Sequence, residues 1–299
     1  MDVGGRRLHI TQSGERGPAV VFESGISASC LNWTRVRDLV AHFTRCYTYD
    51  RASLGWSDPT NAPRIVSQIV EELHALLQAA SVSSPVVLVG HSFGGLLVRA
   101  YALKYPEQVA GLVLVDPLSP REWLQPRDEQ VRMLRRGVRL SRRGALLARL
   151  GVVRLSLALL SGGARMLPQL IARASSGKGE STISRIVGEV RKMPAETWPM
   201  IQAHWCLPKS FLGLAGYLEA LPASCAECGG LPQQYGIPVT ILSGMNSKPS
   251  ELAEREAIAR NSPHGKHIIA AKSGHWVHLD EPELVVQSIQ DMVELAGKG

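Results

Sequence analysis

The chain has 299 residues, of which 45% are hydrophobic and 20% charged, and its formal net charge is +7. This length and hydrophobic content are ample for one large domain with a core, or for such a domain with an insertion. Twelve arginines and three acidic residues fall between residues 121 and 173, so the basic charge belongs to one segment. This uneven distribution argues against a nucleic-acid-binding protein.

The termini and cysteines suggest an intracellular protein. The longest apolar stretch, residues 146–160, is interrupted by Arg149 and Arg154, so no membrane span is predicted. No secretory signal precedes the first strand, which favours a cytoplasmic location, although a leader removed before residue 1 would leave the same sequence. Five cysteines, an odd number, do not suggest a disulfide framework. The lone CxxC pair, Cys225 and Cys228, is interpreted as incidental.

Strand and helix signals alternate in two parts of the chain. Strands are expected at residues 6–10, 19–22, 45–50, 86–90, 111–116, 239–242 and 267–271, and helices at residues 65–80, 96–103, 251–260 and 282–295. The run at 86–90 is apolar throughout, and the run at 111–116 is apolar up to its last residue, Asp116, as in strands buried on both faces of a parallel sheet. This rhythm predicts an α/β fold with a doubly wound, mostly parallel sheet.

The alternation stops between residues 117 and 236. This segment has no convincing strand, and Leu146, Leu150, Val153, Leu157 and Leu160 fall on one stripe at helical spacing. We therefore predict a core formed by residues 1–118 and 237–299, with a helical insertion at residues 119–236.

A candidate nucleophile lies between a predicted strand and a predicted helix. Gly90-His91-Ser92-Phe93-Gly94 fits the G-x-S-x-G pattern in the strand–turn–helix context that a nucleophile elbow requires. The sharp turn needs small neighbours, and the following helix brings its N–H groups and positive dipole end beneath the hydroxyl. The alternative is an ordinary glycine-rich turn, but the complete context favours Ser92 as a nucleophile.

A candidate base lies in the stretch SGHWVHLDEPE, residues 273–283, after the last predicted strand. A loop at the carboxyl end of a strand allows a histidine to reach a serine while one tautomer is held. His275 is this candidate, whereas His278 is expected to pack or cap structurally.

Taken in order, the stretches VVFESGIS, YDRASLGWSDP, LVGHSFGG, LVLVDP and SGHWVHLDEPE resemble the α/β-hydrolase superfamily, in its lid-bearing, serine-esterase-like branch. The resemblance implies that the insertion is a lid placed after the strand that follows the nucleophile helix. It also implies an oxyanion hole formed by the backbone N–H groups of Ile26 and Phe93. Asp50 and Arg51 are expected to form a structural ion pair.

The residue types at the nucleophile elbow also argue against some enzyme classes of the superfamily. Haloalkane dehalogenases and epoxide hydrolases have an aspartate where this chain has Ser92. Proline-type aminopeptidases resemble G-x-S-W-G, and here the residue is Phe93. Among these activities of the superfamily, the residues of the elbow leave chemistry on acyl esters.

The position of the third catalytic group departs from the usual family pattern. In most relatives the acid follows the penultimate strand, and that position is Ser247 here. Some branches carry it at the end of the strand after the nucleophile helix, where this chain has Asp116. Asp116 is therefore the candidate acid, with Glu251 as the alternative, although Asp116 could also merely cap its strand.

These assignments predict a carboxylesterase or lipase-like serine hydrolase with a Ser92–His275–Asp116 catalytic triad. It would cleave carboxylic esters with a sizeable apolar part through an acyl-enzyme. An acyltransferase using the same intermediate and a non-enzymatic ligand receptor remain alternatives. No cofactor, metal or nucleic acid is implied. The arginine-rich lid suggests weak contact with a membrane surface or lipid, or simply a solvated face, and the oligomeric state is left open.

Overall fold

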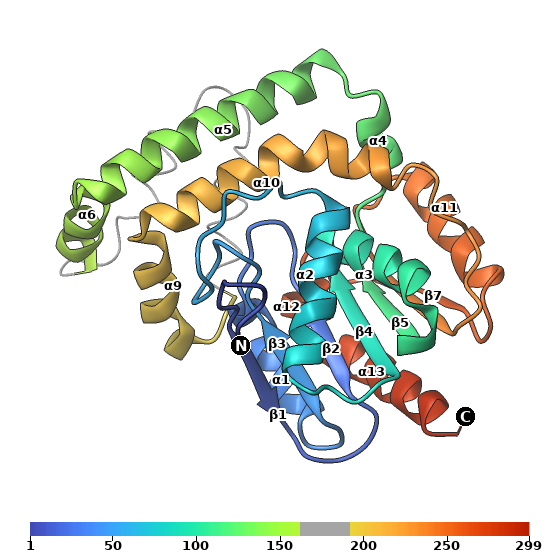
Figure 1. Cartoon of the computed structure of the whole chain (residues 1–299). Helices are drawn as coiled ribbons and strands as arrows, with labels where there is room; N and C mark the ends of the chain where they lie inside the picture. The colour runs from blue at the N-terminus through green and yellow to red at the C-terminus, as the bar shows by residue number, and fades with distance from the viewer. Residues whose placement is uncertain (162–191, 299) are drawn as a thin grey trace.

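The computed structural model describes residues 1–161 and 192–298 of the chain (Figure 1). In this described part, a seven-stranded sheet runs in the order β1-β3-β2-β4-β5-β6-β7. Its strands are β1 (Ile10–Ser13), β2 (Val20–Glu23), β3 (Cys46–Tyr49), β4 (Val86–His91), β5 (Val109–Val115), β6 (Val239–Gly244) and β7 (Lys266–Ala270). All neighbours pair in parallel except β1 and β3, which are antiparallel. The predicted doubly wound, mostly parallel sheet is confirmed.

Helices cover both faces of the sheet (Figure 1). The core helices are α1 (Thr34–Val40), α2 (Val66–Ala79), α3 (Phe93–Lys104), α11 (Pro249–Arg260), α12 (Val277–Asp280) and α13 (Pro282–Ala296). Side chains of β4 alternate between the two faces, since Val86 and Leu88 join the cluster under α2 and α3. Val87 and Val89 join the cluster under α1 and α13. This two-sided burial explains why β4 has successive apolar residues from Val86 to Val89 and does not alternate apolar with polar ones.

The described residues between β5 and β6 form helices and no strand: α4 (Arg121–Leu124), α5 (Asp128–Arg149), α6 (Val152–Ser161), α9 (Trp198–Trp205) and α10 (Pro208–Glu227). Helices α5 and α10 pack along each other above the edge where the parallel strands end (Figure 1). Helix α10 contacts the core through Tyr217, whose hydroxyl donates to the Ala52 carbonyl at 3.2 Å. Within the described residues, no helix is long and apolar enough to cross a bilayer.

The prediction that the leucines of the stripe at residues 146–160 share one face of a single helix is wrong. Helix α5 ends at Arg149, and Gly151, with φ 74°, separates it from α6, so the spacing runs across a helix boundary. The side chains of Leu146 and Leu150 are 58% and 67% exposed and do not face the core. Leu160 lies outside the residues whose side chains the structure describes.

Close backbone approach at the start of α3 requires glycine. A Cβ placed on Gly94 would lie 2.4 Å from the Glu23 carbonyl oxygen, at the end of β2. A Cβ on Gly90 would lie 2.6 Å from the Gly94 carbonyl oxygen. The turn between β4 and α3 can therefore pack against β2 only with these small residues.

We expect Gly94→Ala to destabilise the protein, because its methyl group must push apart the main chains of α3 and β2. Overpacking of this kind costs about 1–3 kcal/mol. Urea unfolding measures the loss. Gly236→Ala is the matched control, since a Cβ there meets nothing within 4 Å. Equal stability of the two variants would contradict the prediction.

Candidate active site

Ser92 occupies a strained turn between β4 and α3. Its φ of 54° and ψ of −118° lie in a region that residues with a side chain rarely adopt. The turn is held by three backbone hydrogen bonds: Ser92 N–H donates to the Val115 carbonyl, and the Ser92 carbonyl accepts from Gly95 and Leu118, each at 3.0 Å. The serine is therefore held at the edge where β4 and β5 end, in the predicted strand–turn–helix context.

Two candidate oxyanion donors flank this turn. Phe93 is the first residue of α3, so its N–H has no partner within the helix. Gly25 lies against the elbow, because a Cβ placed on it would be 3.6 Å from the Ser92 Cβ. The Gly25 carbonyl accepts a hydrogen bond from buried Arg51. In a trans peptide the C=O and N–H point in opposite directions, so this bond orients the Ile26 N–H away from Arg51.

The predicted base and the predicted acid are in direct contact. Asp116 follows β5, with its own N–H bonded to the Leu242 carbonyl at 2.7 Å, and its φ is 42°. His275 lies in the loop after β7, and its Nδ1 is 2.6 Å from Asp116 Oδ2. His91, which precedes Ser92, contacts the His275 carbonyl through Nε2 at 2.9 Å, and the two rings lie 4.7 Å apart. The three predicted catalytic residues therefore converge on one edge of the sheet.

The second oxygen of Asp116 accepts three hydrogen bonds. Oδ1 lies 3.1 Å from the Gly244 amide, 3.0 Å from Ser247 Oγ and 2.7 Å from Arg255 Nη1. Ser247, the position where relatives usually keep the acid, thus donates to the acid in its other location. Sequence reasoning did not identify Arg255, because 139 residues separate it from Asp116 and nothing in its helix marks it as a partner.

The alternative acid, Glu251, lies in a capping position. Glu251 lies in the first turn of α11, where its carboxylate accepts a hydrogen bond from the Lys248 backbone N–H at 3.0 Å. A carboxylate at this place satisfies a free donor and favours the positive end of the helix dipole. Glu251 therefore caps α11.

Burial and charge set the protonation of the groups around His275. Burial raises the pKa of Asp116, but the hydrogen bond from His275 and the charge of Arg255 outweigh it and lower the pKa to about 2. Burial lowers the pKa of His91 well below its usual value and that of His278 to about 3. Both are therefore neutral at neutral pH, and the ring of His278 packs 4.6 Å from Trp33, as its predicted structural role requires.

A small apolar cluster lies beside the His275 loop. Leu31 and Leu279 of the core are buried with Met193, and Ile201 on α9 and Trp276 pack against them. Trp276 follows His275 in the chain, with the two rings 5.7 Å apart. Residues of the insertion thus contribute apolar contacts next to the candidate base.

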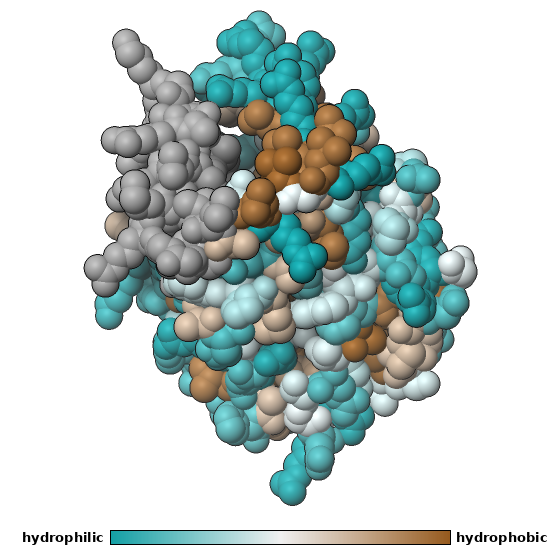
Figure 2. All heavy atoms as spheres, turned by 90° about the vertical axis from the view of Figure 1, so that its left-hand side faces the viewer, coloured by the Kyte–Doolittle hydropathy of each residue, from teal (hydrophilic) through white to brown (hydrophobic). Residues whose placement is uncertain are grey.

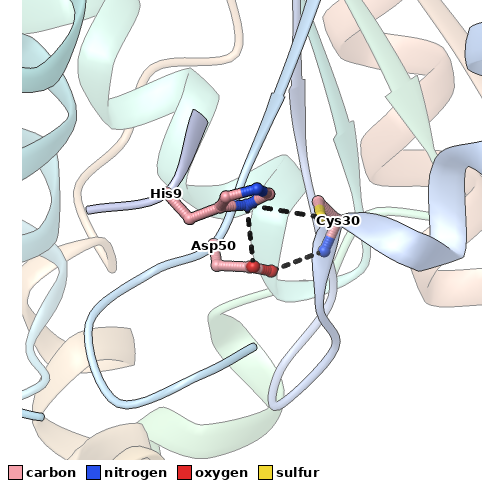
Figure 3. A group of neighbouring side chains, drawn as sticks. All are labelled: His9, Cys30 and Asp50. Atoms are coloured by element: carbon pink, nitrogen blue, oxygen red, sulfur yellow. Dashed lines mark hydrogen bonds and ion pairs between the residues drawn. The ribbon is translucent and has the colours of Figure 1, made fainter. Parts of the chain in front are cut away.

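The expected ion pair between Asp50 and Arg51 is wrong. Asp50 instead contacts His9 at 3.1 Å and accepts a hydrogen bond from the backbone N–H of Cys30 (Figure 3). It accepts a second hydrogen bond from the backbone N–H of Trp56. Arg51 pairs with Glu23 at 3.3 Å, which places it under the loop at Gly25.

His9, Cys30 and Asp50 form the group, among described residues, whose donor atoms lie close enough to share a metal ion, within 4.8 Å of one another (Figure 3). However, both carboxylate oxygens of Asp50 already accept hydrogen bonds. Burial, followed by the nearby Asp50 charge, raises the pKa of the Cys30 thiol, which keeps it protonated. We therefore interpret the cluster as a structural clamp between the chain segments around β1 and β3.

The fold and this site define a class: a doubly wound sheet with a strained serine and a histidine–carboxylate pair at the carboxyl ends of its strands. A family model described as the alpha/beta hydrolase fold matches residues 18–282. The chain therefore belongs to the α/β-hydrolase family, and the resemblance seen in its sequence is confirmed.

Similar proteins include esterases and lipases. Lipase LipV of Mycobacterium tuberculosis is 38% identical over 112 residues, covering 37% of this chain and 41% of the lipase. An esterase from Thermogutta terrifontis matches 99% of this chain and 96% of its own with a TM-score of 0.62 and 20% identity. An epoxide hydrolase from Vigna radiata, VrEH1, matches 98% and 96% with a TM-score of 0.72 and 16% identity, so the fold alone does not separate these activities. The chain spans about 42% of the length of two other curated relatives.

The low pKa of Asp116 predicts a pH-dependent contribution to stability. Because the folded pKa of about 2 is below the ordinary aspartate value of 3.8, ionised Asp116 stabilises the fold above about pH 4, and this stabilisation is lost as the pH falls toward 2. The shift corresponds to about 2 kcal/mol. We expect the free energy of unfolding of the wild type to fall by about this much more than that of Asp116→Asn between pH 5 and pH 2. Parallel pH curves for the two proteins in urea unfolding would contradict the assignment.

Proposed function

We propose that this protein is a serine hydrolase that cleaves carboxylic esters through an acyl-enzyme, with Ser92 as nucleophile, His275 as base and Asp116 as the orienting acid. The observation that carries the proposal is the 2.6 Å contact between His275 Nδ1 and Asp116 Oδ2, beside a serine on a strained turn. Serine rather than aspartate at this turn supports acyl transfer over epoxide or haloalkane hydrolysis. The similarity to an esterase and a lipase supports the same reading.

The mechanism follows from the tautomer of His275. The hydrogen bond that Nδ1–H donates to Asp116 keeps the proton on Nδ1, so the Nε2 lone pair is free to accept the proton of Ser92. The serine oxygen then attacks the ester carbonyl, and the Ile26 and Phe93 N–H groups stabilise the oxyanion. His275 returns the proton to the leaving alcohol, which yields the acyl-enzyme, and a water molecule repeats the sequence to release the acid. Asp116 remains ionised and stabilises the imidazolium in both halves.

The apolar cluster of Leu31, Met193, Ile201, Trp276 and Leu279 supports an ester with a sizeable apolar part. It lies beside the His275 loop and draws side chains from both the core and the insertion. An acyl or alkyl chain bound there would be removed from water, which favours binding by about 0.8 kcal/mol for each buried methylene group. We therefore include an apolar ester in the proposal.

A fluorophosphonate probe tests the nucleophile directly. We expect it to label Ser92 alone, because an activated serine reacts quickly with the probe while ordinary serines do not. Peptide mapping by mass spectrometry identifies the labelled residue, and Ser92→Ala is the control. Ester hydrolysis that survives in Ser92→Ala would exclude the proposed nucleophile, and a protein that binds esters without labelling or turnover would be a receptor.

The acid is tested by two matched amide substitutions. We expect Asp116→Asn to lower kcat by about 10⁴-fold, the loss seen for the matching change in a serine-protease triad, or about 5.4 kcal/mol. The amide no longer favours the tautomer that the reaction needs. Glu251→Gln should change kcat little, because a carboxylate at a helix start contributes at most about 1 kcal/mol of dipole energy. Steady-state kinetics on an ester decide between them, and the reverse order of losses would make Glu251 the acid.

Chain-length preference tests the apolar part of the substrate. We expect Ile201→Ala to reduce kcat/KM for long-chain p-nitrophenyl esters by several-fold, while acetate hydrolysis changes little, since each lost methylene contact is worth about 0.8 kcal/mol. Leu150→Ala is the control, because Leu150 is 67% exposed at the far end of α5. Equal losses on all esters would place Ile201 outside the substrate site.

A further inference from the structure

We propose that Arg255 is a positioning residue of the esterase site: it holds Asp116 toward His275, and its charge sets the pH range in which the pair works. This inference rests on the function proposed above. Arg255 lies on α11 and is 5% exposed. Its hydrogen bonds go to Asp116, Pro117, Ser243 and Ser247, and not to Ser92. It would therefore act only through Asp116.

The guanidinium of Arg255 fixes Asp116 from two sides. Nη1 donates to Asp116 Oδ1 at 2.7 Å, and Nη2 donates to the carbonyl of the next residue, Pro117, at 2.7 Å. Nη1 also lies 2.9 Å from both Ser243 Oγ and Ser247 Oγ; Ser243 is the penultimate residue of β6, and Ser247 follows the strand. A planar group held at four points resists rotation of the carboxylate. Oδ2 is therefore kept facing His275.

Arg255 is the charged group that contacts the Asp116–His275 pair, on the side of α11. In the described structure, the ring of His91 lies against His275 and that of His278 lies against His91; both are neutral, so they supply no competing charge. His267 of β7 reaches Arg255 only through Ser243, and it pairs with Glu256 of α11 at 2.9 Å. Arg255 is thus the permanent cation in contact with Asp116.

A cation here opposes the addition of a proton to the hydrogen-bonded Asp116–His275 pair. It favours ionised Asp116 by direct contact. Because the two groups interact strongly, they titrate as a pair, and loss of the cation moves the protonation of the pair to higher pH. A role limited to fold stability would leave this titration where it is.

The test is the acid limb of the pH profile of kcat/KM. We expect Arg255→Met to move this limb up by about one pH unit, since an adjacent charge shifts titration by one to three units. Arg255→Lys keeps the charge and should keep the limb, while kcat falls because the fork geometry is lost. Arg99→Met is the matched control, a buried arginine on α3 that bonds Tyr235 and not Asp116.

An unmoved limb in folded Arg255→Met, or an equal shift in Arg99→Met, would overturn the proposal. Where Arg255→Met fails to fold, the pair Asp116→Asn and Asp116→Asn/Arg255→Met replaces it, because the double variant buries no unpaired charge. Because Arg255 acts through Asp116, kcat/KM should then be the same in the two variants, and a further loss in the double variant would overturn the proposal. Failure of the proposed function would give a different result: ester hydrolysis would persist in Ser92→Ala.

A different observation carries a second inference, on the outer surface of α5 and α6. Met133, Arg136, Leu140, Arg143 and Leu147 recur every three or four residues, so they share one face of α5, and all are exposed. The face continues at the corner with α6 into further exposed apolar side chains: Leu146, Leu150, Val152 and Leu155. Figure 2 shows hydrophobic side chains gathered on the side of the molecule where α5 and α6 meet, with hydrophilic ones beside them.

The positive charge of this face favours an anionic partner. Helix α5 carries seven arginines, and in the described part of the chain only Arg142 has a carboxylate within reach, that of Glu219 at 2.6 Å. Alternation of exposed leucine with unpaired arginine suits the boundary of an anionic bilayer, where apolar side chains enter the acyl region and cations meet the headgroups. We infer that α5 and α6 dock this protein onto an anionic phospholipid surface.

Sedimentation with vesicles tests this docking. We expect the protein to bind phosphatidylglycerol-containing vesicles and not pure phosphatidylcholine vesicles, and Arg136→Glu/Arg143→Glu to weaken binding about tenfold or more. Arg16→Glu/Arg260→Glu makes the same change of charge on exposed positions of the core and should bind like the wild type. Absence of binding to anionic vesicles, or equal loss in the control, would overturn the inference. Concentration-dependent dimerisation abolished by Arg136→Glu/Arg143→Glu would overturn it as well, by making the face an interface between copies.

Discussion

The carboxylate of Asp116 is buried, and its ionisation depends on every donor around it. An unpaired buried carboxylate costs several kcal/mol. Here one oxygen accepts from a backbone amide, a serine hydroxyl and a guanidinium, and the other is left for His275. Asp116 itself follows β5, and the donors come from the end of β6 and the loop after it, from α11 and from the loop after β7. The register of neighbouring parallel strands is therefore what assembles the site.

Strain is stored at the ends of two neighbouring strands. Ser92 after β4 and Asp116 after β5 both have positive φ, although neither is glycine. Such residues cost about 1–3 kcal/mol each and persist only where the surroundings hold them. Ser92 is bonded to the Val115 carbonyl and to the Leu118 amide, and Asp116 to the Leu242 carbonyl. The apolar strands behind them supply the rigidity, and the strained residues turn their side chains toward the site.

The sequence predicted which strands precede the candidate catalytic residues, but not the hydrogen bonds that connect those residues to the rest of the fold. Apolar runs predicted the central strands because burial on both faces leaves no choice of residue type. The elbow at Ser92 and the loop at His275 have local signatures, and Asp116 emerged because position 247 held no acid. Arg255 had no such signature, since a helix position reveals nothing about a partner 139 residues away.

Two expectations failed for the same physical reason. Asp50 and Arg51 are adjacent in the chain but point to different partners, because successive side chains leave the end of a strand in opposite directions. The leucine stripe assumed one helix, and a single glycine with positive φ divided it. Both depend on a local backbone direction that side-chain patterns do not encode.

The structure separates the charged groups of the candidate site from the apolar contacts beside them. The hydrogen bonds that position Asp116 and His275 come from core elements, where β5, β6, β7 and α11 constrain one another. The apolar contacts beside His275 are shared with Met193 and Ile201 of the insertion. A change in the insertion can therefore alter the shape of the apolar site without moving the charges on which proton transfer depends. A change in the core cannot do so, because each donor to Asp116 also holds a strand end or a helix in place.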